Sequence, residues 1–158
     1  MPVIVVGADT TWGTAIVPAL QPASGEVRVF VSDTAVGDRY RTHAKVAIGD
    51  LSDGSHVGGA AIGAFCAVVM AAAAHDNRER GFAATAAAVF AQWADGLKDA
   101  AVSRIIVVGS LDEIPNPDPL RNIGAEYHCV DTSDGDHDAV ASAVARLEAA
   151  EPRTAATP

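Results

Sequence analysis

Residues 1–20, MPVIVVGADTTWGTAIVPAL, decide the fold of this chain. Val3 to Val6 form a short, continuous β-branched run, which is typical of a strand buried on both faces of a parallel sheet. Gly7 ends that run, and from Gly13 onward the apolar residues have helical spacing. The stretch therefore predicts a strand, a glycine-bounded turn and a helix, the order that opens a phosphate-binding βαβ unit.

The composition is that of an ordinary globular domain, with 49% hydrophobic and 20% charged residues in a chain of 158. We expect one domain over residues 1–150 and a disordered tail over residues 151–158. The formal net charge of −9 and the aromatic content of 5% argue against nucleic acid and anionic membranes as partners, because polyanions are repelled. No apolar run approaches the roughly 20 residues of a membrane span. We expect a cytoplasmic protein in which Cys66 and Cys129 are buried, reduced thiols.

Further apolar runs alternate with helix-like stretches along the rest of the chain. This alternation predicts a parallel sheet with helical crossovers. We expect a three-layer, doubly wound α/β fold with strand order 3-2-1-4-5-6 and a ligand at the carboxyl ends of strands one and four. The expected strands are 3–6, 27–31, 45–48, 65–70, 105–108 and 127–130, and the main later helices are 77–101 and 138–150.

Three motifs lie on this framework: GADTTWG at 7–13, GDLSD at 49–53 and AAVSRIIVVGS at 100–110. They are similar, in order, to a Gly-Ala-Thr-Gly-x-x-Gly turn, a Gly-Asp-x-x-Asp motif and the strand that leads to an active-site serine. Together they resemble the short-chain dehydrogenase/reductase superfamily, especially its atypical NmrA-like and epimerase-like members. The resemblance implies a Rossmann-like fold with a nicotinamide dinucleotide as cofactor.

The expected cofactor contacts come from the glycine turn and from three strand ends. Asp33 lies at the end of the second strand, where a carboxylate accepts hydrogen bonds from the hydroxyl groups of the adenosine ribose and repels a 2′-phosphate. This position favours NAD over NADP. Arg39 and Arg41 follow closely enough to reach a 2′-phosphate. By resemblance, Asp50 contacts the adenine. The full expected set is Gly7, Asp9, Thr10, Thr11, Trp12, Gly13, Asp33, Asp50, Leu51, Ala71 and Ala72.

The glycine turn departs from the family pattern at three positions. Thr10 replaces the middle glycine, and Trp12 stands where it can plug the crevice. Asp9 is expected to place a carboxylate near the phosphates, a like-charge penalty of about 1 kcal/mol or more. A tight turn that binds no nucleotide is therefore an equally open interpretation.

The family's catalytic pair, Tyr-x-x-x-Lys, has no counterpart in this sequence. Tyr127 is followed four residues later by Asp131, which would raise the pKa of a phenol rather than lower it, and no lysine follows Lys98. The remaining catalytic candidates are Ser110, at the family's serine position, and His75, just past the fourth strand. We expect no ordinary short-chain dehydrogenase catalysis.

Two further features are an acidic run before the last helix and a helix rich in large apolar residues. The acidic run DTSDGDHD at 131–138 precedes a helix, so we expect capping rather than a metal site. The helix at 81–101 carries Phe82, Phe90 and Trp93, which is more apolar bulk than one sheet-facing stripe needs. It is the candidate interface of a homodimer or of a complex with another protein.

Three functions stay open at this point. The first is a non-catalytic module with a degenerate dinucleotide site that senses NAD(H) or binds a partner. The second is an NAD(P)-dependent oxidoreductase with a non-standard active site. The third is a structural subunit that binds no nucleotide.

Overall fold

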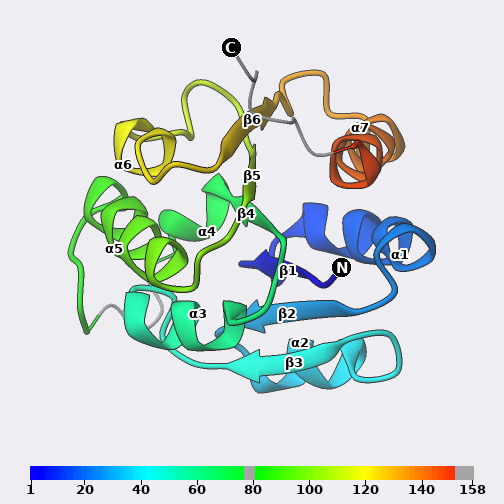
Figure 1. Ribbon diagram of the computed structural model, residues 1–158, viewed down its shortest axis with the longest axis horizontal. Coiled ribbons are helices and arrows are strands. Elements are labelled where there is room, and N and C mark those ends of the chain that lie inside the picture. Colours follow the sequence, from blue (N-terminus) through cyan, green and yellow to red (C-terminus); the bar gives the residue numbers. More distant parts are fainter. Residues whose placement is uncertain (77–80, 152–158) are drawn as a thin grey trace, which may run out of the picture.

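One six-stranded sheet organises the chain in a computed structural model, which describes residues 1–76 and 81–151, with the backbone alone for residues 21–24. The order β3-β2-β1-β4-β5-β6 confirms the predicted topology, and every pairing is parallel (Figure 1). The strands are β1 (Val3–Val6), β2 (Val27–Val31), β3 (Lys45–Ile48), β4 (Cys66–Met70), β5 (Arg104–Val108) and β6 (Glu126–Val130). The helices are α1 (Thr11–Ser24), α2 (Thr34–Tyr40), α3 (Gly54–Ala61), α4 (Ala71–Ala74), α5 (Ala86–Asp99), α6 (Asp118–Arg121) and α7 (His137–Ala149).

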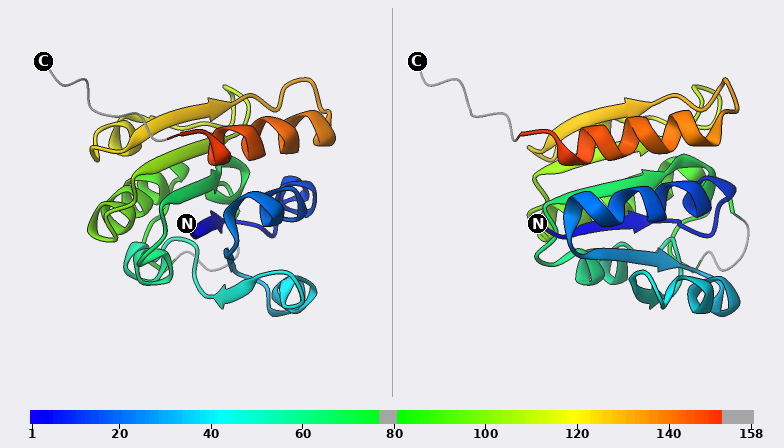
Figure 2. Two further views of the ribbon diagram at one scale, coloured as in Figure 1. Left: turned by 45° about the vertical axis from the view of Figure 1, so that its right-hand side comes forward. Right: turned by 90° about the vertical axis from the view of Figure 1, so that its right-hand side faces the viewer.

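The helices form a layer on each face of the sheet. Helices α1, α2 and α7 cover one face, and α3, α5 and α6 cover the other (Figure 1). All strands point the same way, so their carboxyl ends meet at one edge of the sheet (Figure 2). None of the helices within the described ranges has both the length and the apolar character needed to cross a bilayer.

The central strands are buried along their whole length. Every residue of β1, β4 and β5 is buried, as expected for runs rich in valine and isoleucine that carry helices on both faces. The largest apolar side chains of the core include Phe30, Phe90 and Trp93, all at 0% exposure. The predicted central position of the first and fourth strands is therefore confirmed.

The two cysteines differ in environment. Cys66 lies in the central strand β4, and burial raises the pKa of its thiol to about 12. Cys129 lies in β6, at the edge of the sheet, and is exposed. The prediction that both are buried is wrong for Cys129, because an edge strand has a neighbour on one side only.

Helix α7 is fixed to the sheet by a buried arginine. Arg104, at the start of β5, is 1% exposed and pairs with Glu126 at 2.9 Å. Its guanidinium also donates to the carbonyl oxygens of Leu147, Glu148, Ala150 and Glu151. These carbonyl groups lie at and just beyond the end of α7, so a strand side chain satisfies the helix terminus.

The predicted long helix over 77–101 is shorter in the structure. Its described part is α5, from Ala86 to Asp99, and residues 81–85 form a bent, non-helical segment instead. The reason lies in the earlier loop, because Asp50 and Ser52 accept the N–H groups of Gly81 and Phe82. Thr85 then caps the new helix start by accepting from the N–H of Ala88. Residues 77–80, and residues 152–158 of the predicted tail, lie outside the described residues.

Candidate functional site

The β1–α1 turn is built around two glycines. Gly7 has a φ of +81°, and a Cβ atom placed on it would lie 2.3 Å from Cβ of Ala73 in α4. A Cβ placed on Gly13 would lie 2.2 Å from the carbonyl oxygen of Ala8. Glycine is therefore required at Gly7 for conformation and space, and at Gly13 for close packing of α1 on the turn.

The Asp9 carboxylate points away from the start of α1. Its Oδ2 accepts from the backbone N–H of Ser32 at 3.0 Å and from the Ser32 hydroxyl at 2.7 Å. Two donors at the end of β2 therefore hold this carboxylate on the Ser32 side of the turn.

The start of α1 carries little that would compete with an anion. Thr10 is the N-cap, makes no side-chain capping bond, and no acidic residue lies in the first turn. The Thr10 hydroxyl oxygen is buried and has no hydrogen-bond partner within the described part of the chain. Backbone N–H groups at a helix start and the helix dipole are the features with which proteins bind anions in general.

Trp12 is held by a neighbouring helix. Its ring stacks on that of His137, the first residue of α7, with ring centroids 4.1 Å apart. Trp12 contributes no surface to the cavity described next. The indole therefore leaves the cavity between α1 and α2 open.

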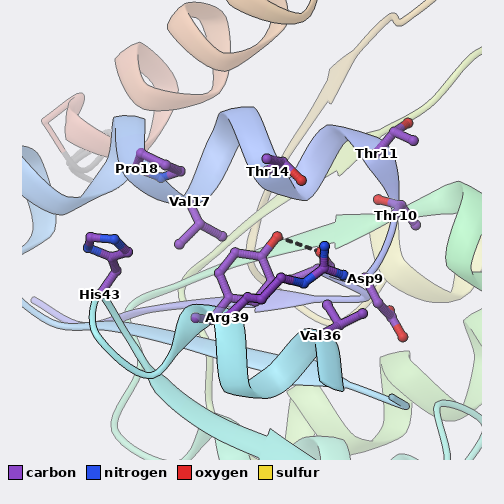
Figure 3. Close-up of a pocket in the computed structure, with 11 residues that line it drawn as sticks. Asp9, Thr10, Thr11, Thr14, Val17, Pro18, Val36, Arg39 and His43 are labelled. Atoms are coloured by element: carbon purple, nitrogen blue, oxygen red, sulfur yellow. Dashed lines mark hydrogen bonds between the residues drawn. The ribbon is translucent and has the colours of Figure 1, made fainter. Parts of the chain in front are cut away.

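A cavity of about 420 Å³ lies between α1 and α2 (Figure 3). Its polar lining comes from Asp9, Thr10, Thr11, Thr14, Arg39 and Tyr40, among others. The Tyr40 hydroxyl donates to the Ala8 carbonyl oxygen at 2.7 Å, which ties α2 to the β1–α1 turn. Burial raises the pKa of the Tyr40 phenol, so this donor stays protonated at neutral pH.

The charged residues after β2 divide into three roles. Asp33 caps α2, a helix that the polar stretch 34–43 did not predict, by accepting from the N–H of Ala35 at 2.8 Å. Arg39 lines the cavity. Arg41 pairs with Asp38 at 2.9 Å on the exposed side of the segment. Of the two arginines predicted to reach a 2′-phosphate, the structure places only Arg39 at the cavity.

Asp50 joins two loops at the carboxyl end of β3. Its Oδ1 accepts from the N–H and hydroxyl of Ser52, and its Oδ2 accepts from the N–H of Gly81 at 2.8 Å. Burial acts to raise the pKa of Asp50, but the hydrogen bonds from Ser52 and Gly81 outweigh it and hold the pKa below its usual value. The carboxylate predicted to contact the adenine therefore has a structural role in joining the two loops.

The other residues predicted to contact the cofactor, Leu51, Ala71 and Ala72, differ in how exposed they are. Leu51 is 3% exposed, and its carbonyl oxygen accepts from the indole N–H of Trp93 at 2.7 Å. Ala71 is fully buried, with its Cβ 2.6 Å from where a Cβ on Gly109 would stand. Ala72 is partly exposed at the carboxyl end of β4. Of these three, the structure leaves Ala72 accessible to a ligand.

Polar groups that follow β4, β5 and β6 converge at the carboxyl edge of the sheet. Glu113 accepts from the N–H of Ser110 at 3.1 Å, and its Oε1 lies 3.4 Å from the Ser110 hydroxyl and 3.5 Å from that of Thr132. His75 donates from Nε2 to the Glu113 carbonyl oxygen at 2.6 Å, since a carbonyl can only accept. Sequence reasoning missed Glu113, although Ser110-x-x-Glu113 is a capping-box pattern that signals this contact.

The structure brings no tyrosine and lysine together at the sheet's carboxyl edge. The two lysines of the sequence lie elsewhere: Lys45 begins β3, and Lys98 is in the last turn of α5 before β5. Tyr127 pairs in register with Ile105, near the start of β6, and burial raises the pKa of its phenol.

The acidic run before α7 forms local turns and a cap. Asp136 accepts from the N–H of Ala139, and Asp131 accepts from the N–H and hydroxyl of Ser133. The predicted capping role is confirmed at Asp136. Within residues 1–76 and 81–151, no three or more His, Cys, Asp or Glu side chains are placed to hold a metal ion.

Solved structures resemble this chain along most of its length. Triphenylmethane reductase from Citrobacter sp. matches 96% of the chain with a TM-score of 0.74 at 15% identity, and a second structure of that enzyme is complexed with NADP(H). The NADPH-dependent quinone oxidoreductase of Escherichia coli matches 80% with a TM-score of 0.64 at 20% identity. The anaerobillin reductase of E. coli O157:H7 matches 82% with a TM-score of 0.60 at 18% identity.

These likenesses decide the architecture. The chain has the fold of NAD(P)-dependent reductases. The predicted Rossmann-like fold is therefore confirmed. The chain spans 66% of the triphenylmethane reductase, 47% of the quinone oxidoreductase and 71% of the anaerobillin reductase. No family model matches the sequence, and a search of curated proteins finds no match.

Proposed function

We propose that the chain binds a nicotinamide dinucleotide, NAD(H) in preference to NADP(H), and acts as a sensing or partner-binding module without the Tyr–Lys pair. The observation that carries this proposal is the start of α1. The Asp9 carboxylate is turned toward Ser32, and the first helical turn has neither a side-chain cap nor an acidic residue. An anion-binding position is therefore kept beside a glycine turn.

The residues present fit a pyrophosphate with one compromise. Gly7 and Gly13 keep the turn tight, and the buried Thr10 hydroxyl has no partner within the described residues, so a phosphate oxygen would give it one. The compromise is the Thr10 side chain itself, because the family's bare backbone at this position lets phosphates come closer.

Replacing Thr10 by glycine tests this site. We expect T10G to tighten NADH binding several-fold, because it removes bulk where the backbone meets the phosphates. The measurement is the shift in melting temperature with NAD(H) and NADP(H) at millimolar concentration, with Ser142→Gly on α7 as the control for glycine in a helix. If neither dinucleotide shifts the melting temperature of the wild type or of T10G, the proposal fails.

A second function, an oxidoreductase with a non-standard site, is favoured by the convergence of Ser110, Glu113 and His75. When bound, a nicotinamide supplies or accepts a hydride; Ser110 would hold a substrate oxygen, and the Glu113 carboxylate could take its proton. This function predicts slow oxidation of simple alcohols with NAD, lost in S110A and E113Q. No absorbance change from NADH formation with the wild type would leave the sensing module as the better proposal.

A homodimer through residues 81–101 is kept as part of the proposal, on narrower grounds. Phe90 and Trp93 are fully buried within the chain, while Phe82 is 59% exposed. Light scattering coupled to size exclusion tests it: we expect a dimer that F82S weakens. A wild-type monomer at high concentration would remove the dimer from the proposal.

A further inference from the structure

Two carboxylates lie at the end of β2, and the structure gives them different positions. We propose that Asp9, rather than Asp33, accepts the hydroxyl groups of the adenosine ribose and rejects a 2′-phosphate. This assignment rests on the proposed dinucleotide site and names the residue that sets its cofactor preference.

Asp9 is held in place for this role. Its Oδ2 accepts from both the N–H and the hydroxyl of Ser32, which fixes the carboxylate at the carboxyl end of β2. Asp9 also belongs to the turn that precedes α1, and it lines the cavity between α1 and α2. The same turn therefore carries the phosphate position at Thr10 and Thr11 and, beside it, a fixed carboxylate.

Asp33 has a different role in the structure. Its Oδ1 accepts from the N–H of Ala35 and caps α2, and it contributes no surface to the cavity. A carboxylate that caps a helix is held toward that helix's backbone. The residue that usually recognises the ribose in this fold is therefore directed elsewhere.

Arg39 supplies the opposing charge. Its side chain extends along the cavity from α2 toward Asp9, above Val36 (Figure 3). A guanidinium in this position attracts a 2′-phosphate, whereas the Asp9 carboxylate repels it. With both present, the ribose diol is accepted and a phosphate on it is penalised. Removing the Asp9 charge leaves Arg39 to favour the phosphate.

The test is calorimetric titration of NAD and NADP into the full chain and into D9N, D33N and D9N/R39A. The ratio of NADP to NAD affinity should rise about tenfold in D9N, since one negative charge facing a phosphate is removed. The rise should disappear in D9N/R39A. Asparagine retains an oxygen that can accept from Ser32, and D9S serves as a second variant should D9N unfold. D95N removes an equal charge at an exposed position on α5 and should leave the ratio unchanged.

The outcomes separate this assignment from the proposed function. If NAD binds the wild type but the ratio is unchanged in D9N and D9S, or rises in D33N instead, Asp9 is not the selecting residue and the proposed function stands. If neither dinucleotide binds any variant, the proposed function fails and the assignment fails with it.

Discussion

At the residue scale, Asp50 shows how a candidate ligand contact also stabilises the fold. Its carboxylate accepts from Ser52 and Gly81, and these bonds hold its pKa below the unfolded value of about 3.9. A lowered pKa means that the stabilisation is fully present above the unfolded value. It is lost as the pH falls through the folded pKa.

We therefore expect D50N to reduce the free energy of unfolding by about 1 kcal/mol at neutral pH, since charge-assisted bonds are weakened. Urea unfolding across a pH series should show the difference shrinking as the pH falls below about 4. Asp95→Asn, at an exposed position on α5, is the matched control and should change little. A D50N effect of equal size at low and neutral pH would contradict this account.

Residue positions were more predictable than side-chain directions. The turn formed by Gly7 and Gly13 follows from local sequence, because Gly7 has a positive φ and Gly13 packs against the Ala8 carbonyl of the same turn. The direction of Asp9 does not, because it depends on Ser32, which reaches the turn only when β1 and β2 pair. Glu113 had a local signal in its spacing from Ser110, yet its contact with Thr132 requires β5 and β6 to lie side by side.

At the scale of elements, α3 and α5 pack backbone against backbone. A Cβ placed on Gly58 would lie 2.6 Å from the Gly96 carbonyl oxygen, and one on Gly96 would lie 2.1 Å from that of Gly54. The adjacent Gly59 has nothing within 4 Å. The same helix therefore offers a glycine that packing requires and one that it does not.

This contrast predicts opposite effects of alanine at neighbouring positions. G59A should stabilise the protein by about 0.5–1 kcal/mol, because alanine favours a helix over glycine. G58A should destabilise it by about 1–3 kcal/mol, because α3 and α5 must move apart. Urea denaturation of both variants checks the signs. Equal effects of the two substitutions would mean that the close approach is not real.

Element boundaries were predictable where the signals were local. The caps of α3 and α7, Asp53 and Asp136, follow from acidic residues that precede apolar spacing. Helix α2 was missed because its stretch is polar and contains Gly37, and its stability comes partly from Tyr40 packing beneath α1. The start of α5 at Ala86 was misplaced because Asp50 and Ser52 bind the preceding residues from another loop.

At the scale of the whole molecule, two arginines join strands to the ends of helices. Arg104 is 1% exposed, pairs with Glu126 and binds the end of α7. Arg28, in β2, donates to the Ala60 carbonyl at the end of α3 and pairs with Glu26 at 3.5 Å, with 21% of its side chain exposed. The two contacts are alike in role and differ in burial.

Replacing each arginine by methionine tests whether the loss in free energy of unfolding depends on how deeply the arginine is buried. R104M is expected to cost about 3–5 kcal/mol, because it removes the buried cation that pairs with Glu126 and the donor to several carbonyl groups at the end of α7. R28M should cost about 1 kcal/mol or less, because water can replace a partly exposed ion pair. Guanidinium chloride unfolding measures both. A loss in R104M no larger than that in R28M would show that the buried pair adds nothing.

The global topology was the most predictable feature. Continuous apolar strands such as Val3–Val6 leave few options besides a parallel sheet covered on both faces, and the strand order follows from the crossovers. The burial of Arg104 was not predictable, because the sequence gives no sign that the end of α7 meets the start of β5. The exposure of Cys129, by contrast, could have been expected, because the predicted strand order already placed the sixth strand at the edge of the sheet.

The most direct test of the central claim is a crystal structure of the protein soaked with NADH. The account predicts pyrophosphate oxygens within hydrogen-bonding distance of the backbone N–H groups at the start of α1, with Trp12 still stacked on His137. A dinucleotide bound elsewhere, or a saturated soak with no nucleotide at the β1–α1 turn, would contradict it.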